Sequence, residues 1–178
     1  MCRYGADDEG NMNEQSQLGY LSGKALRGEP LDDNDFRTVE SFVADNAEAG
    51  VQANSILAIA GNAEQRSNGF KGLRRICEQP GICHKGLAVA CLLNTLEILP
   101  MTQLRTAYFI DLVHEAAKHP FLGARINAMR VLRRLAKRGD QKAIQLLRDG
   151  TKDAHSYVSA TAQASLRLAG IDTGRSGN

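Results

Sequence analysis

The stretch that decides the fold is GDQKAIQLLRDGTKDAHSYVSATAQASLRLAG, residues 139–170. Its first half places Ala143, Ile144 and Leu147 on one side of a helix, because residues three or four positions apart share a helical face. Its second half, residues 156–169, repeats this spacing and is followed by glycine, which is typical of a helix C-terminus. The stretch therefore predicts two short amphipathic helices joined by a polar turn.

The same pattern occurs earlier in the chain at a fixed distance. Ala128 and Leu132 precede Ala162 and Leu166 by 34 residues. A period of this length with a helix pair as its unit indicates an α-solenoid, in which neighbouring pairs stack because one pair cannot bury its own apolar side. The equivalent starts of second helices are Val51, Ala124 and Val158, and the expected pairs cover residues 31–61, 66–99, 101–138 and 139–170.

These residues resemble the HEAT-like repeats of the phycobilisome-lyase type. The resemblance rests on the Gly-Asp turn at 139–140, the Ala-Ile pair with a downstream leucine, Asp153 near the turn, and the small residues that follow Val158. Ser159 stands where the pattern usually has arginine, whereas Arg125 keeps that arginine in the preceding unit. The resemblance implies an all-α, right-handed α-α superhelix of the HEAT/armadillo-like type with about four helix pairs, and Asp153 is expected to cap the last helix.

Composition agrees with an all-α globular protein. Hydrophobic residues make up 43% of the 178 residues, aromatic residues only 5%, and tryptophan is absent, which is little for a β-sandwich or barrel. No apolar run reaches the length that spans a bilayer, so no membrane insertion is expected. The polar residues 1–17 lack the basic start and apolar run of a secretory signal, which favours the cytoplasm.

Charge divides the chain unevenly. Residues 1–50 hold four Lys/Arg against eleven Asp/Glu, whereas residues 51–178 hold eighteen against nine. We predict a flexible acidic leader over residues 1–28, a HEAT-like α-solenoid over 29–170 and a flexible tail over 171–178. Two interpretations of this asymmetry are open. The acidic leader folds back over a basic surface, or the acidic and basic residues lie on separate solvated faces.

The strongest functional signal is a basic arc along the helix expected at residues 125–138. At 100° per residue Arg130, Arg133, Arg134, Lys137 and Arg138 share one side, opposite Val131, Leu132 and Leu135. The HEAT-like resemblance implies that this helix lines the concave surface where partners bind. The candidate partner-binding residues are Arg125, Arg130, Arg133, Arg134, Lys137 and Arg138.

This arc favours a non-enzymatic scaffold or adaptor that binds a protein partner of acidic or mixed charge. The alternative is nucleic-acid binding through the same arc, although the aromatic residues that stack bases in single-strand binders are lacking. A solvated helix face without a partner is the third interpretation. A second cluster of Lys71, Arg74 and Arg75 is expected on the convex side.

An enzymatic function has less support in the sequence than a binding function. His114-Glu115 matches the His-Glu dyads of deoxyhypusine hydroxylase, a HEAT-like enzyme, but a single dyad does not complete a two-metal site. HEAT-like DNA glycosylases combine aromatic residues, including tryptophan, with a catalytic aspartate, and Asp111 is the one acid deep within a helix near aromatic residues here. We predict no catalytic residue, metal or cofactor.

Cysteine usage points to neither a disulfide scaffold nor a metal site. The four cysteines, Cys2, Cys77, Cys83 and Cys91, are too few and too clustered for a disulfide framework in a chain of this length. Their spacing contains no compact Cys-x-x-Cys pair, so a zinc site with His84 is disfavoured. Thiols buried on helix faces account for them more simply.

Overall fold

The computed structural model describes residues 14–45 and 48–171, and these residues form helices without a strand. This confirms the all-α prediction. The helices are α1 (Glu14–Leu26), α2 (Asp33–Ser41), α3 (Glu48–Ala60), α4 (Ala63–Cys77), the 3-10 helix η1 (Ile82–His84), α5 (Gly86–Ile98), α6 (Met101–Leu104), α7 (Ala107–Ala116), α8 (Leu122–Ala136), α9 (Gln141–Gly150) and α10 (Ser156–Leu168).

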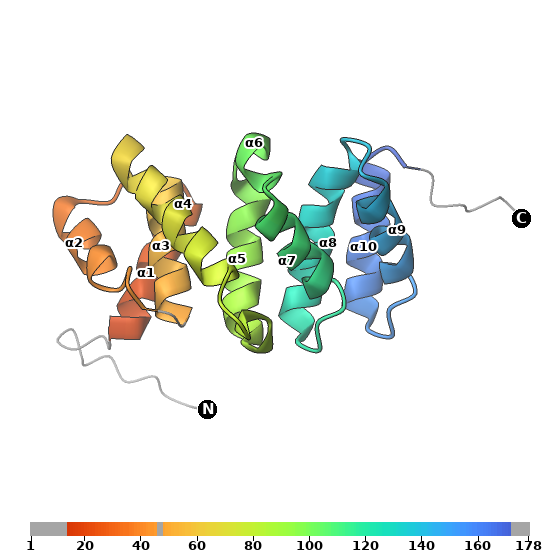
Figure 1. The fold of residues 1–178 in the computed structure, drawn as a ribbon, viewed down its shortest axis with the longest axis horizontal. Coiled ribbons are helices and arrows are strands. Elements are labelled where there is room, and N and C mark those ends of the chain that lie inside the picture. The colour runs from red at the N-terminus through yellow and green to blue at the C-terminus, as the bar shows by residue number, and fades with distance from the viewer. Residues whose placement is uncertain (1–13, 46–47, 172–178) are drawn as a thin grey trace, which may run out of the picture.

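The helices form two layers along the length of the molecule (Figure 1). In one layer, α1, α3, α5, α8 and α10 each pack against the next. In the other, α2, α4, α7 and α9 lie across the same side of this row, with α4 packed chiefly against α3 and also against α7. Each of the four expected helix pairs contains two of the longer helices. However, α4 packs mainly against α3, which belongs to the preceding expected pair.

The 34-residue period marks the positions that face the core. Ala128 and Leu132 on α8 are fully buried, as are Ala162 and Leu166 on α10. Alanine at the first of these positions lets the helices approach closely, and leucine at the second fills the space between them. The four residues related by the 34-residue spacing are therefore core residues of two neighbouring helices.

Local signals in the sequence set the ends of several helices. The Asp32 carboxylate accepts hydrogen bonds from the backbone N–H groups of Asn34 and Asp35 at 2.9 and 2.8 Å, and so caps α2. Asp140 caps α9 in the same way by accepting from the N–H of Ala143 at 2.9 Å. Gly139 has a positive φ of 84°, a conformation that glycine adopts without strain, and it turns the chain after α8.

Part of the expected leader is built into the helical array. Residues 14–26 form α1, and its side chains Leu18, Leu21 and Ala25 are buried against α3. Their spacing of three and four residues gives α1 one continuous apolar side, which is the physical reason that it packs. The first 13 residues of the leader, and all but Ile171 of the expected tail, lie outside the described residues.

The first half of the expected helix pair 101–138 is divided into two helices, α6 and α7. The single turn α6 ends at Leu104, Thr106 has extended backbone with φ −77° and ψ 144°, and α7 begins at Ala107. In an unbroken helix, Leu104 and Phe109 would point about 140° apart. The break allows both side chains to be buried in the core, where they are 0% and 2% exposed.

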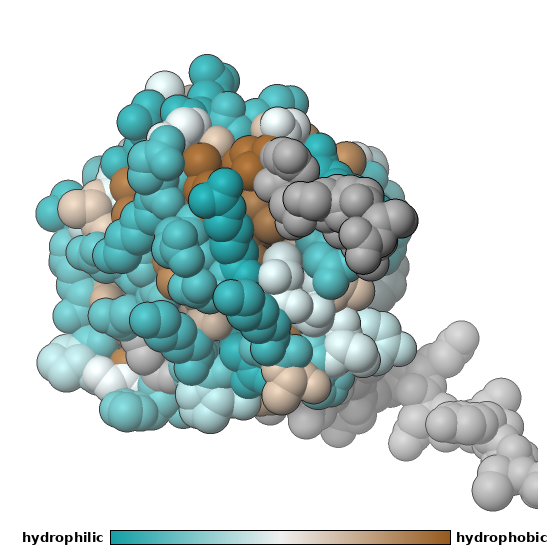
Figure 2. All heavy atoms as spheres, turned by 90° about the vertical axis from the view of Figure 1, so that its right-hand side faces the viewer, coloured by the Kyte–Doolittle hydropathy of each residue, from teal (hydrophilic) through white to brown (hydrophobic). Residues whose placement is uncertain are grey.

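The end of the molecule formed by α9 and α10 is largely hydrophilic (Figure 2). None of the described helices combines the length and the apolar character that crossing a bilayer requires.

Candidate binding surface

Helix α8 occupies a central position and carries the basic residues that the sequence singled out. It packs against α5, α7, α9 and α10, and Val131, Leu132 and Leu135 on its apolar side are buried. A helix held by four neighbours presents its remaining side chains on a fixed support. The six candidate cations of this region have different surroundings: one group of two contacts backbone carbonyls, a second group of three is exposed, and one cation pairs with Glu97.

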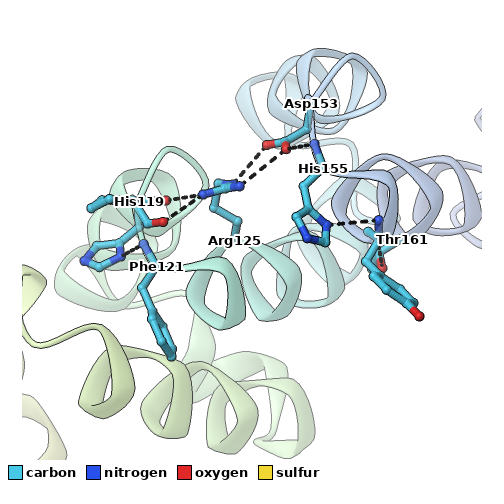
Figure 3. A network of polar contacts seen from close by, with 8 residues as sticks. His119, Phe121, Arg125, Asp153, His155 and Thr161 are labelled. Atoms are coloured by element: carbon cyan, nitrogen blue, oxygen red, sulfur yellow. Dashed lines mark hydrogen bonds and ion pairs between the residues drawn. The ribbon is translucent and has the colours of Figure 1, made fainter.

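Arg125 is a structural link rather than a free cation (Figure 3). Its Nε donates to the Asp153 carboxylate at 3.0 Å, and its Nη1 donates to the carbonyl oxygens of His119 and Pro120 at 2.9 and 3.1 Å. The side chains of this ion pair are only 19% and 17% exposed. Arg125 therefore joins the loop before α8 to the loop before α10.

Asp153 contributes to the start of α10 indirectly, so the prediction that it caps this helix is wrong in detail. Its Oδ1 accepts the backbone N–H of His155 at 2.8 Å, while His155 itself occupies the N-cap position. The His155 Nδ1 accepts the N–H of Tyr157 at 3.4 Å (Figure 3). Asp153 lies two positions before the N-cap residue His155, which is too early in the chain for a direct cap.

Arg134 is also engaged by the backbone. Its guanidinium donates to the carbonyl oxygens of Leu96, Glu97 and Leu99 at 2.9, 2.8 and 2.6 Å. These carbonyl groups lie at the C-terminal end of α5, where a helix has no intrahelical partners for them. Burial lowers the pKa of Arg134 from its ordinary value. The guanidinium stays charged, because arginine does not lose its proton in proteins.

Arg133 is intermediate between the two groups. Its Nη2 lies 3.3 Å from the Glu97 carboxylate, and both side chains are partly exposed. Exposed pairs of this kind contribute little stability. Arg133 therefore neutralises the charge of Glu97 locally. Glu97 is the acidic residue that lines the cavity described below.

Three cations remain exposed: Arg130, Lys137 and Arg138. They form no ion pair with any residue that the structure describes, and Arg130 makes only a 3.4 Å contact with Asn127. Arg130 and Lys137 are seven positions apart, so they lie on the same side of α8. We call these three residues the α8 cation cluster.

A cavity of about 670 Å³ lies beside this cluster. Lys137 and Arg138 line it together with Arg133 and Arg134, and Met101 and Leu168 supply apolar walls. Leu168 is 62% exposed, which is high for a leucine in a packed helix. Positive charge next to exposed apolar surface is the combination that a protein partner with acidic and apolar side chains would fit.

The residues considered for catalysis do not converge. Across residues 14–45 and 48–171, no group of three or more His, Cys, Asp or Glu side chains lies close enough to hold a metal ion. His114 is 9% exposed, and burial together with Lys142 lowers its pKa from the ordinary 6.5. Asp111 is exposed, and the neighbouring Tyr108 ring packs against the Arg74 guanidinium.

The second basic cluster separates as well. Arg75 donates to the carbonyl oxygen of Val43 at 2.9 Å, whereas Lys71 and Arg74 line a cavity between α4 and α7. Phe70, which directly precedes Lys71 in the sequence, lines the same cavity, and residues between 98 and 109 form its opposite wall.

Comparisons with protein families, with curated proteins and with solved structures find no match to this chain.

Proposed function

We propose that the chain is a HEAT-like helical-repeat protein, a right-handed solenoid of about four helix pairs, that binds a protein partner of acidic or mixed charge through the α8 cation cluster. Support for the repeat comes from the buried positions of α8 and α10 that recur every 34 residues and from the two layers of stacked helices. In such a solenoid the row containing α3, α5, α8 and α10 would form the concave side. The role is non-enzymatic.

The division of the α8 cations is the observation that carries this proposal. Arg125 and Arg134 are used to join neighbouring loops and helices, so a structural requirement explains them. No such requirement accounts for Arg130, Lys137 and Arg138, which are exposed on α8, at its C-cap and in the turn that follows. Unpaired cations on a rigid support favour binding of an acidic surface, because little order is lost on association.

Affinity capture from native extract tests the proposal. We expect the full-length wild-type chain to retain a partner that the Arg130→Glu/Lys137→Glu/Arg138→Glu variant loses. The matched control is Arg105→Glu/Lys118→Glu/Lys152→Glu, which makes the same change in charge at exposed positions elsewhere. Equal capture by both variants, or recovery of nucleic acid in place of protein, contradicts the proposed partner.

A further inference from the structure

A second cavity, of about 840 Å³, lies between α4 on one side and the α5–α6 turn and α7 on the other. Its volume falls within the range of about 300–1,000 Å³ that is usual for ligand sites. Its lining includes Arg66, Lys71 and Arg74 but neither aspartate nor glutamate. We call it the α4–α7 pocket.

Two of its three cations are held in place. Arg66 donates from Nε to the carbonyl oxygen of Gly61 at 2.6 Å. Arg74 lies over the Tyr108 ring at 4.9 Å and pairs with Glu78 at 2.9 Å, in a contact that is more than half exposed on both sides. Lys71 is exposed between them on α4. The pocket therefore presents positive charge at defined positions.

The remaining walls are suited to a partly apolar ligand that also donates hydrogen bonds. Phe70, Ile98 and Pro100 line the pocket, and Ile98 is 50% exposed. Gln103 lines it too, and its buried Oε1 accepts no hydrogen bond from the described residues. A buried acceptor without a donor is costly, so a ligand with N–H groups would gain from reaching it.

The α4–α7 pocket and the cavity beside the α8 cation cluster meet at one turn. Glu97 and Met101 border the α8 cavity, whereas Ile98, Pro100 and Gln103 border the α4–α7 pocket. An extended segment that crosses this turn can thus contact both.

We propose that the α4–α7 pocket binds an acidic and apolar peptide segment of the same partner protein, with carboxylates near Lys71 and Arg66 and an apolar side chain against Phe70 and Ile98. This inference rests on the proposed partner-binding function and adds a second anchor to it. A peptide supplies all three features that the walls call for: carboxylates, an apolar side chain and backbone N–H groups for Gln103.

The test is a titration of the ¹⁵N-labelled full chain with the peptide Ac-Glu-Phe-Glu-Leu-Glu-NH2, followed by backbone amide shifts. We expect shifts in residues 66–74 and 98–108. Lys71→Glu should weaken binding by about fivefold or more, as loss of one charge contact implies. Lys152→Glu makes the same change in charge far from both cavities and should leave the affinity unchanged, and the neutral peptide Ac-Gln-Phe-Gln-Leu-Gln-NH2 should bind more weakly.

Absence of shifts in residues 66–74 and 98–108, or equal affinity for the neutral peptide, would overturn the inference. So would tighter binding of inorganic phosphate or AMP at the same residues, because the pocket would then select a small phosphate. Partner capture separates this inference from the proposed function. Capture lost with the triple α8 variant but kept with Lys71→Glu overturns only the second anchor, whereas the reverse result overturns only the role of the α8 cation cluster.

Discussion

At the residue scale, the arginines of α8 differ in what their guanidinium groups contact. Arg134 donates to three carbonyl oxygens at the end of α5, and Arg125 joins a carboxylate to two carbonyls. Arginine can do this because its planar group carries five donors in a fixed geometry. Lys137 and Arg138, only three and four positions from Arg134, are exposed and have no such partners among the described residues.

Replacing Arg134 with methionine should therefore destabilise the fold. Arg134→Met keeps much of the aliphatic stem but leaves the carbonyl groups of Leu96, Glu97 and Leu99 without their donor. We expect the free energy of unfolding to fall by about 1–3 kcal/mol. Urea denaturation measures this directly. The control Arg138→Met should change it by less than about 0.5 kcal/mol, and similar values for the two variants would contradict the division of the α8 cations.

His114 gives the stability a defined dependence on pH. Burial first, and Lys142 second, lower its pKa in the folded chain, although Asp140 and Asp111 act in the opposite direction. The unfolded chain then binds the proton more readily, so the contribution of neutral His114 to stability is present above about pH 6.5 and is lost as the pH falls from there through the lower folded-state pKa. His114→Leu should flatten the decline seen in denaturation curves between about pH 7 and 5.

The exposed His84 supplies the control for this titration, because His84→Leu removes a histidine with ready access to solvent. We expect its pH profile to match that of the wild type. A profile of His114→Leu that is as steep as the wild-type profile would show that other groups cause the loss of stability in acid.

Periodicity alone predicted which side of α8 carries the cations, since a spacing of 100° per residue follows from helix geometry. It could not predict that Arg134 reaches the end of α5 or that Arg125 reaches Asp153. Those contacts join residues 28 to 38 positions apart, and they depend on how neighbouring helices are offset along their axes. The sequence thus indicated the basic side but not which of its members remain exposed.

At the element scale, the contact between α3 and α4 depends on a missing side chain. A Cβ placed on Gly69 would lie 2.6 Å from the backbone oxygen of Asn54 and 2.7 Å from the backbone nitrogen of Ala58. Both atoms belong to the backbone of α3, so a neighbouring side chain cannot relieve the clash by turning away. The two helices can approach this closely only with glycine at position 69.

Gly69→Ala should therefore destabilise the chain by about 1–3 kcal/mol, which is typical of overpacking. The matched variant is Gly19→Ala on α1, where no atom lies within 4 Å of the new Cβ. There alanine should stabilise by about 0.5–1 kcal/mol through its higher helix propensity. Thermal unfolding of both variants measures the difference, and a shift in the same direction for both would contradict the close contact.

Helix boundaries were predictable where local chemistry sets them, as at Asp32 and Gly139. The packing of α1 was not, because its sequence is polar overall and its apolar side consists of only a few residues. The spacing of Leu18, Leu21 and Ala25 was the available signal. The break at Thr106 was not predictable either. It is favoured by the burial of Phe109 in the core and not by a local stop signal in the sequence.

At the scale of the whole molecule, α1 completes the core at one end of the row. Leu18 and Leu21 share a cluster with Val39, Ile56 and Leu57. Removing α1 would expose the side of α3 that carries Ile56 and Leu57. This end of the array therefore depends on residues that the sequence assigned to a leader.

Deletion of residues 1–28 should lower the melting temperature, because each fully buried leucine contributes about 1.5–3 kcal/mol. Deletion of residues 1–13 is the control, since it keeps α1 and removes none of the described core residues. Calorimetry compares the two. The shorter deletion is also the variant that tests whether the acidic leader competes with a partner, because it preserves the described fold. Equal melting temperatures for both deletions would contradict a structural role for α1.

The most direct test of the central claim is the salt dependence of binding by the α8 cation cluster. We would measure the affinity of the full chain for its captured partner and for a DNA duplex, in the wild type and in Arg130→Glu/Lys137→Glu/Arg138→Glu. We predict that the wild type prefers the protein partner and that the variant loses about tenfold or more of that affinity, equivalent to about 1.4 kcal/mol. Tighter binding of the duplex, with a log-log salt slope of about −2.7 for three contacted phosphates, would contradict the claim, as would unchanged partner affinity in the variant.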